Sequence, residues 1–252
     1  MAIYITGDTH GDFRRFNMSY FPEQRELTRD DYMIICGDFG GVWDWNGEGK
    51  HEKNWLNWLE EKSYTTLVVD GNHENHLRLA EYPIRVFWGG RVHEIRPHVL
   101  HLMRGEYYDI NETTFFTFGG ARSHDIDGGI LDVDDPDYKE KRKRLERDWC
   151  PFRVNKRTWW EQEMPNTTEK MHGMQILKKH DNKVDFIITH DCPASTLALF
   201  GHGMYKPDEL NMYLEEIRAN TEYRRWFFGH YHDNRNVTAR EIMIYEQMVQ
   251  IA

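Results

Sequence analysis

Five short polar segments, each directly after an apolar run, are the feature that most constrains what this chain can fold into. Their sequences are GDTHG at 7–11, GD at 37–38, GNHE at 71–74, THD at 189–191 and GHYH at 229–232. If the apolar runs are strands, the polar side chains project from the carboxyl-terminal edge of a sheet, where α/β folds place their binding sites. The neighbouring glycines let the backbone turn sharply and approach a bound ion closely. The pattern predicts a site assembled from several strand ends.

The apolar runs themselves predict a layered α/β fold. Strands are expected at 2–6, 32–36 and 65–69, with an amphipathic helix at 50–62 between the second and the third. Strand, helix and strand in succession are typical of such a fold. Closely spaced runs from 84 to 118 favour an antiparallel sheet. Later strands are expected at 184–189, 225–228 and 242–247, with a helix at 208–221.

The residue types in the five segments are those that bind divalent metals. Carboxylates, imidazoles and one amide, without a thiolate, suit hard to borderline ions. Two ions about 3.5–4 Å apart can hold a phosphoryl group for in-line displacement. Seven side chains and a water, with one carboxylate shared, fit such a dinuclear centre. The candidates are Asp8, His10, Asp38, Asn72, His190, His230 and His232.

Each segment alone has a simpler explanation. A single histidine such as His10 is more often a surface or core residue than a ligand, and GNHE also fits a helix start with Asn72 as its N-cap. Asp191 and Glu74 fit either a capping role or contact with a ligand histidine. Five such segments at successive strand ends are hard to obtain by chance, so the set favours a metal centre.

Composition narrows the class of partner. The 252 residues carry a formal charge of −10, which argues against extended nucleic-acid binding because that requires a basic face. No apolar run is long enough to cross a bilayer, and the first residues resemble no signal peptide. Three cysteines without paired spacing fit a reducing compartment. We therefore expect a cytoplasmic protein without membrane contact; composition does not indicate an oligomeric state.

Residues 125–157 interrupt the pattern. They contain few periodic apolar residues, and acids from 132 onward are followed by bases between 139 and 147. We interpret them as a charged insertion, an acidic loop followed by a solvated helix, within a single domain of residues 1–252. A nucleic-acid-binding arm is the alternative, but the mixed signs favour a solvated surface.

Taken together, the five segments resemble the calcineurin-like metallophosphoesterase superfamily, in that family's order and across residues 7–232. The resemblance implies a four-layer α/β sandwich, in which two mixed sheets are flanked by helices and a dinuclear metal site lies at strand ends. It also implies that His73 lies beside the metals without binding them. The ligands it implies are Asp8, His10 and His232 for one metal, Asn72, His190 and His230 for the other, and Asp38 bridging both.

The first and third segments look most like the branch containing Ser/Thr protein phosphatases and dinucleoside polyphosphate hydrolases. That branch has GDxVDRG where this chain has GDFGGVW, so Gly41 replaces the aspartate that orients the catalytic histidine and Val42 replaces a phosphate-binding arginine. The two histidines of GHYH also depart from that branch. The segments at 118–125, 159–163, 184–185 and 192–193 look like a group of small bacterial and phage metallophosphoesterases.

Another residue has to take the place of that arginine. Arg122 is the candidate, because it follows a strand and two glycines and a planar guanidinium suits phosphate. Pairing of Arg122 with Asp125 or Glu163 is the alternative. Weaker candidates are Arg14, Arg78 and His124. Four tryptophans fit either a nucleobase platform or ordinary packing, namely Trp43, Trp45, Trp159 and Trp160.

The predicted function is metal-dependent hydrolysis of a phosphate mono- or diester. A hydroxide held between two divalent ions through Asp38 would attack phosphorus, and His73 would assist the leaving oxygen. Mn²⁺ is the expected ion, with Fe, Zn or Ni as alternatives. The expected substrate is a phosphorylated small molecule or nucleotide. A nuclease, a protein phosphatase and a non-catalytic metal-binding module are the alternative functions.

Overall fold

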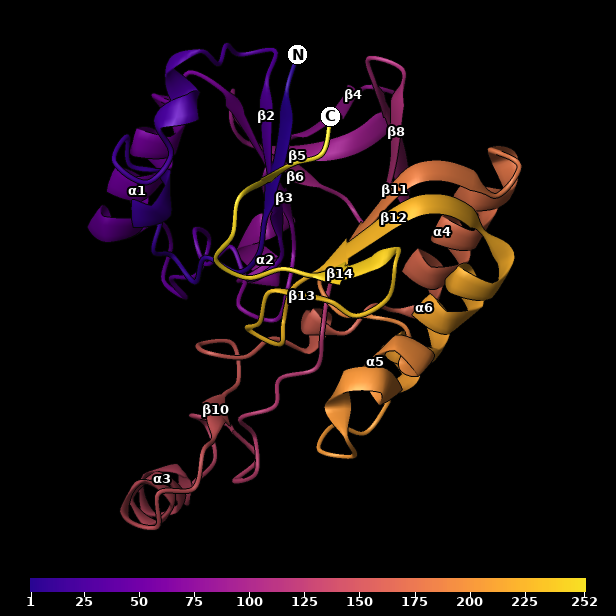
Figure 1. Cartoon of the computed structure of the whole chain (residues 1–252). Helices are drawn as coiled ribbons and strands as arrows, with labels where there is room; N and C mark the ends of the chain where they lie inside the picture. Colours follow the sequence, from indigo (N-terminus) through magenta and orange to yellow (C-terminus); the bar gives the residue numbers. More distant parts are fainter.

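Two β-sheets stacked face to face form the centre of the molecule, which the computed structural model describes over residues 1–252 (Figure 1). The first sheet has seven strands in the order β15-β1-β2-β3-β6-β5-β4. Its inner strands β1, β2, β3 and β6 run parallel, so their carboxyl ends share one edge. The bounds are β1 (Ile3–Thr6), β2 (Tyr32–Cys36), β3 (Thr65–Val69), β4 (Ile84–Phe87), β5 (Gly90–Arg96), β6 (Val99–Leu102) and β15 (Val249–Gln250).

The second sheet has six strands in the order β13-β14-β12-β11-β8-β7. Strands β8, β11, β12 and β14 run parallel, and the outer strands β7 and β13 are antiparallel to their neighbours. Its parallel strands therefore also end at a common edge. The bounds are β7 (Glu106–Ile110), β8 (Thr113–Phe118), β11 (Lys183–Thr189), β12 (Glu222–Phe228), β13 (Arg235–Asn236) and β14 (Glu241–Met243).

Three separate apolar clusters show that the molecule has four layers. In β2, Ile34 faces the cluster between the two sheets, whereas Met33 and Ile35 face the cluster outside the first sheet. This alternation follows from the two-residue period of a strand, and both faces are apolar because both are covered. A third cluster lies on the outer face of the second sheet.

Helices cover the two outer faces. Helix α1 (Lys50–Glu60) packs on the first sheet through Leu56 and Leu59. Helices α4 (Thr167–Lys179), α5 (Ala194–Gly201) and α6 (Glu209–Asn220) cover the second sheet on the opposite side of the molecule (Figure 1). A single turn, α2 (His76–Leu79), follows GNHE. The predicted four-layer sandwich of two mixed sheets flanked by helices is confirmed.

Two sequence-based expectations about strands were wrong. The runs from 84 to 118 do not form one antiparallel sheet, because β4–β6 join the first sheet and β7–β8 join the second. The last expected strand, at 242–247, ends as β14 at Met243. Beyond that point the chain crosses to the first sheet, where the Tyr245 carbonyl accepts a hydrogen bond from the Gly7 amide.

The charged residues 125–157 extend away from the two sheets (Figure 1). Short strands β9 (Ile130–Leu131) and β10 (Arg153–Val154) pair in parallel at the base of this segment. Helix α3 (Tyr138–Arg147) lies between them, and Leu145 is its one buried residue. No helix of the chain has the length and apolar character needed to cross a bilayer.

Candidate metal centre

The two sheets bring all seven sequence-predicted ligands to one place. Residues of the first three segments follow β1, β2 and β3, and those of the last two follow β11 and β12. Because these strands are parallel within each sheet, their carboxyl ends meet at a shared edge of the sandwich. Two groups of side chains gather there, close enough to hold a cation each, and they share Asp38.

The first group consists of Asp8, His10, Asp38 and His232. A carboxylate oxygen of Asp8 lies 3.1 Å from Nε2 of His232, and the Nε2 atoms of His10 and His232 are 2.9 Å apart. Nδ1 of His10 lies 3.7 Å from Asp38. All the ligand atoms of the group lie within 4.8 Å of one another, which is close enough to hold one ion.

The second group consists of Asp38, His190 and His230. Nε2 of His190 lies 3.2 Å from Asp38 Oδ1 and 3.3 Å from Asn72 Oδ1, which brings the predicted amide ligand to the same place. His124, predicted only as a weaker candidate, adjoins this group, with its Nε2 3.2 Å from Nε2 of His230.

The backbone around these residues is strained. His10, Asp38, His230 and His232 all have left-handed φ angles, at 47°, 44°, 68° and 51°. Such angles cost about 1–3 kcal/mol each and are concentrated at functional sites. At Gly37, whose φ is 88°, a side chain would also collide with the His190 ring. The glycine therefore permits the close approach of two strand ends.

The electrostatics of the site suit a cation. Asp8 and Asp38 are 0% and 1% exposed, and burying two carboxylates side by side is costly unless positive charge lies close to them. Burial lowers the pKa of His190, but Asp38 and Asp8 outweigh it and raise that pKa to about 10, so without an ion the ring carries a proton that a bound metal would have to displace. Burial lowers the pKa of His10 and His230, which keeps both imidazoles neutral and able to bind a metal. The donor set fits divalent ions.

Two buried carboxylates hold the loops of the site together. Glu74 accepts hydrogen bonds from the amides of Gly40 and Gly71, at 3.1 and 2.5 Å, and so joins the GDFGG and GNHE loops. Burial raises the pKa of Glu74 to about 8. Asp191 accepts from the Tyr231 hydroxyl at 2.5 Å, which fixes the GHYH loop from within. Both residues support the loops that carry the histidines.

His73 belongs to neither group of ligand atoms and lies beside them. Its amide donates to Asp38 Oδ1 at 2.8 Å, and its ring meets the edge of the His10 ring at 4.7 Å. The Trp43 ring stacks on it at 5.3 Å. Burial lowers the pKa of His73 to about 4, so the ring is neutral at pH 7.

Arg153 is a site residue that the sequence analysis missed. Its Nη2 lies 2.9 Å from His73 Nε2, and its side chain is only 10% exposed. Asp125 and the Thr158 carbonyl hold the guanidinium at 2.8 and 3.1 Å. Arg153 lies in β10, among many bases of the charged segment, and nothing in the sequence distinguishes it from them.

Arg122, the sequence-based candidate for phosphate binding, pairs with Asp208. Its side chain is 52% exposed, and its Nε donates to Asp208 at 3.2 Å. The alternative pairing with Asp125 or Glu163 is not observed, because Asp125 binds Arg153 and Glu163 accepts from Ser123.

The four tryptophans have different environments. Trp43 lies on His73, and Trp160, which is 2% exposed, packs edge-on against Trp43. Trp45 is 53% exposed, with the Arg157 guanidinium over its ring. Trp159 is part-buried. Trp160 is thus a core residue, and Trp43 and Trp45 remain near the site.

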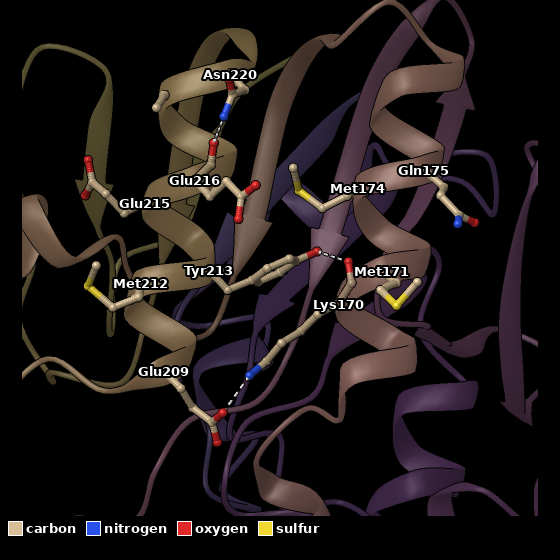
Figure 2. Close-up of a pocket in the computed structure, with 11 residues that line it drawn as sticks. Lys170, Met171, Met174, Gln175, Glu209, Met212, Tyr213, Glu215, Glu216 and Asn220 are labelled. Carbon is tan, nitrogen blue, oxygen red and sulfur yellow. Dashed lines mark hydrogen bonds and ion pairs between the residues drawn. The ribbon is translucent and has the colours of Figure 1, made fainter.

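Three cavities differ in their relation to this centre. A groove of about 940 Å³ between α4 and α6 shares no residue with it (Figure 2). Across this groove Lys170 pairs with Glu209 at 3.1 Å, and the Tyr213 hydroxyl donates to the Lys170 carbonyl at 3.0 Å. A cavity of about 970 Å³ adjoins the centre at His10, and one of about 390 Å³ adjoins it at Trp43.

Comparison with known proteins identifies the family. No curated protein matches the chain significantly. A family model of the calcineurin-like phosphoesterases matches residues 1–234, which include every segment that contributes to the two ligand groups. The match confirms the resemblance seen in the sequence, and the chain belongs to the calcineurin-like phosphoesterase family.

Proposed function

We propose that this protein hydrolyses phosphate esters at a centre of two divalent ions. The observation that carries the proposal is the pair of ligand groups joined by the buried carboxylate of Asp38. In this assignment Asp38 bridges the ions. Two bound ions would activate a water as nucleophile and neutralise the phosphoryl oxygens. The first ion is assigned to Asp8, His10 and His232, and the second to Asn72, His190 and His230.

His73 is proposed to assist the leaving oxygen. A guanidinium can only donate hydrogen bonds, so Nε2 of His73 accepts from Arg153 and Nδ1 carries the ring proton. Burial keeps the ring neutral at pH 7, which makes it a hydrogen-bond donor rather than an imidazolium acid. The stacked Trp43 and the His73 amide bond to Asp38 fix its position.

Arg153 is proposed to bind the phosphoryl oxygens. Its guanidinium is aimed at His73 and oriented by Asp125 and the Thr158 carbonyl. A planar guanidinium forms two parallel hydrogen bonds to phosphate. Arg153 would thus supply the positive charge that is missing where Val42 replaces the phosphate-binding arginine of the related branch. Arg122, the sequence-based candidate for the same task, stays a prediction to be compared with it.

The finer assignments are likewise proposals. Mn²⁺ is the expected ion, with Fe, Zn or Ni as alternatives. The expected substrate is a phosphorylated small molecule or nucleotide, since a net charge of −10 disfavours extended nucleic acid. We infer a cytoplasmic enzyme from its three free cysteines. Residues 1–252 are treated as one domain with the charged insertion at 125–157.

The test is hydrolysis of p-nitrophenyl phosphate and bis-p-nitrophenyl phosphate after chelation and reloading with Mn²⁺. Turnover that requires the metal and is lost in Asp38→Asn supports the proposal. Diester turnover indicates a phosphodiesterase, and turnover of the monoester alone indicates a phosphatase. Two bound ions with no hydrolysis of either ester would favour the non-catalytic alternative.

A further inference from the structure

A pocket of about 390 Å³ lies between the loop after β2 and the charged segment, and Trp43, which stacks on His73, forms part of its wall. Its volume lies within the range of about 300–1,000 Å³ that is usual for small-molecule sites. Four aromatic rings and two arginines dominate its lining, namely Trp43, Trp45, Tyr138, Phe152, Arg142 and Arg157.

This pocket is connected to the candidate centre through two shared elements. Trp43 lines the pocket and also stacks on the His73 ring. Val154 lines it too, and the preceding residue, Arg153, reaches His73 Nε2 at 2.9 Å. An occupant of the pocket therefore lies next to the histidine that we place at the leaving oxygen.

The chemistry of the lining favours a flat aromatic ring. The Arg157 guanidinium lies 4.5 Å from the centre of the Trp45 ring and forms no ion pair. Trp45 remains 53% exposed, although a large apolar ring is usually buried. Exposed aromatic surface beside a guanidinium that has no carboxylate partner suits a nucleobase, whose flat π-face stacks on aromatic rings and guanidinium groups.

The other cavity at the centre offers less for such a ligand. It is larger, about 970 Å³, and includes His10. Its Arg14 is already paired with Asp12, and its Arg15 donates to the Asp8 and Tyr245 carbonyls. Both arginines of that cavity are engaged, whereas in the smaller pocket Arg142 pairs with Glu146 but Arg157 forms no ion pair.

We propose that the pocket at Trp43 and Trp45 binds the nucleobase of a nucleoside phosphate whose phosphate lies at the metal centre. This inference rests on the proposed function, because it identifies the alcohol part of the ester. A free nucleotide and the end of a nucleic-acid strand share this chemistry.

The first experiment uses metal-free protein, so that it does not depend on the metal centre. Adenosine is titrated into the chelated, ¹⁵N-labelled protein, with ribose as the control ligand, and the tryptophan indole N–H signals are followed by NMR. We expect adenosine to shift the signals of Trp43 and Trp45 and to leave Trp149 unchanged, because Trp149 is 93% exposed on the same segment and lines no part of the pocket. No shift with adenosine, or equal shifts with ribose, overturns the proposal.

A variant series tests the stacking. Trp45→Ala is expected to weaken adenosine binding about 5-fold or more, because this is the loss of affinity expected when one base–aromatic stack is removed. Trp45→Phe, which keeps a ring, should restore most of the affinity. The matched controls are Trp149→Ala and Tyr20→Ala, the latter in the other cavity, and both should bind as the wild type does. Weakening by Tyr20→Ala but not by Trp45→Ala overturns the assignment.

Hydrolysis by the Mn²⁺-loaded protein then distinguishes a free nucleotide from the end of a nucleic-acid strand as the ligand. It also tests the proposed ester hydrolysis separately from the proposed nucleobase pocket. Faster turnover of AMP than of a short single-stranded oligoadenylate identifies free nucleotides, and the reverse identifies strand ends. Adenosine binding without hydrolysis of these substrates or of either p-nitrophenyl ester contradicts the proposed function and leaves the pocket supported. Ester hydrolysis without adenosine binding contradicts the pocket alone.

Discussion

Asp38 is the single residue on which both halves of the candidate metal centre depend, because it is the one member shared by the two ligand groups. Asp38→Asn keeps the shape of the side chain and removes its charge. We therefore expect loss of both ions, measured as metal content per chain after reloading with Mn²⁺. The control, Asp12→Asn, makes the same change at an exposed carboxylate on the neighbouring loop and should retain both ions. Two ions in the Asp38→Asn protein would contradict the bridging role.

His73 should affect turnover and not metal content, because its ring lies beside the ligand atoms and not among them. His73→Ala is expected to lower kcat by about 10²–10³, the usual cost of removing one hydrogen-bond donor to an oxygen on which negative charge develops. His51→Ala, an exposed histidine on α1, serves as control. A His73→Ala protein with full activity and full metal content would remove His73 from the mechanism.

Arg153 and Arg122 make a direct comparison between the arginine found in the structure and the one expected from the sequence. Arg153→Ala should raise KM for an ester about 10- to 100-fold, the range for a lost charge-assisted hydrogen bond, without loss of metal. Arg122→Ala should change KM little, because Arg122 is half-exposed and paired with Asp208. The opposite ranking of the two KM values would return the phosphate-binding role to Arg122.

Element ends carry most of the local interactions that shape this molecule, and the start of α6 is a clear example. The Asp208 side chain accepts from the Leu210 and Asn211 amides, at 2.8 and 3.1 Å, and Asn211 bonds back to the Asp208 amide. Asp208→Ala removes this cap and should lower the free energy of unfolding by about 0.5–2 kcal/mol in urea titrations. Arg122→Ala, which removes only the exposed ion pair, should lower it by no more than about 1 kcal/mol. A larger effect of Arg122→Ala would show that the ion pair, not the cap, stabilises this end.

At the scale of the whole molecule, a buried ion pair joins the end of β3, in the first sheet, to Arg104, in the loop that leads into β7 of the second sheet. Asp70 pairs with Arg104 at 2.5 Å, and the same guanidinium donates to the Gln162 carbonyl at 2.9 Å. Burial raises the pKa of Asp70, but Arg104, with His101 and His76, lowers it by more, so the pKa lies well below its usual value.

A depressed carboxyl pKa makes stability depend on pH in one direction. The stabilisation by Asp70 is present above the unfolded-state pKa of about 3.9 and is lost as pH falls toward the folded-state value. The free energy of unfolding should therefore decline as the pH falls below about 4, and Asp70→Asn should flatten that decline. Asp148→Asn, at an exposed pair with Arg147, should leave the slope nearly unchanged. Equal slopes in wild type and Asp70→Asn would contradict the role of this pair.

Local patterns predicted the parallel centre of each sheet well. The strands at 32–36 and 65–69 have the predicted bounds, because fully buried parallel strands are continuous apolar runs bounded by glycine and aspartate. The same patterns do not say which sheet a strand joins, and the runs between 84 and 118 are divided between two sheets. Helices α4 and α5 were not predicted, because their sequences do not show a strongly amphipathic pattern. Packing against the second sheet stabilises them instead.

The sequence by itself determined the family, the layered α/β class and the seven candidate ligands, because each ligand lies within four residues of a strand end and parallel strands end at one edge. Only the tertiary structure decided what surrounds them. Arg153 contacts His73 although the two lie 80 residues apart along the chain. Arg122 pairs with Asp208, and Trp43 both stacks on His73 and lines a pocket. Local sequence spacing determines which side chains lie at a strand end. Contacts between distant parts of the chain, such as that of Arg153 with His73, depend on how the charged segment 125–157 packs, and no local pattern predicts this.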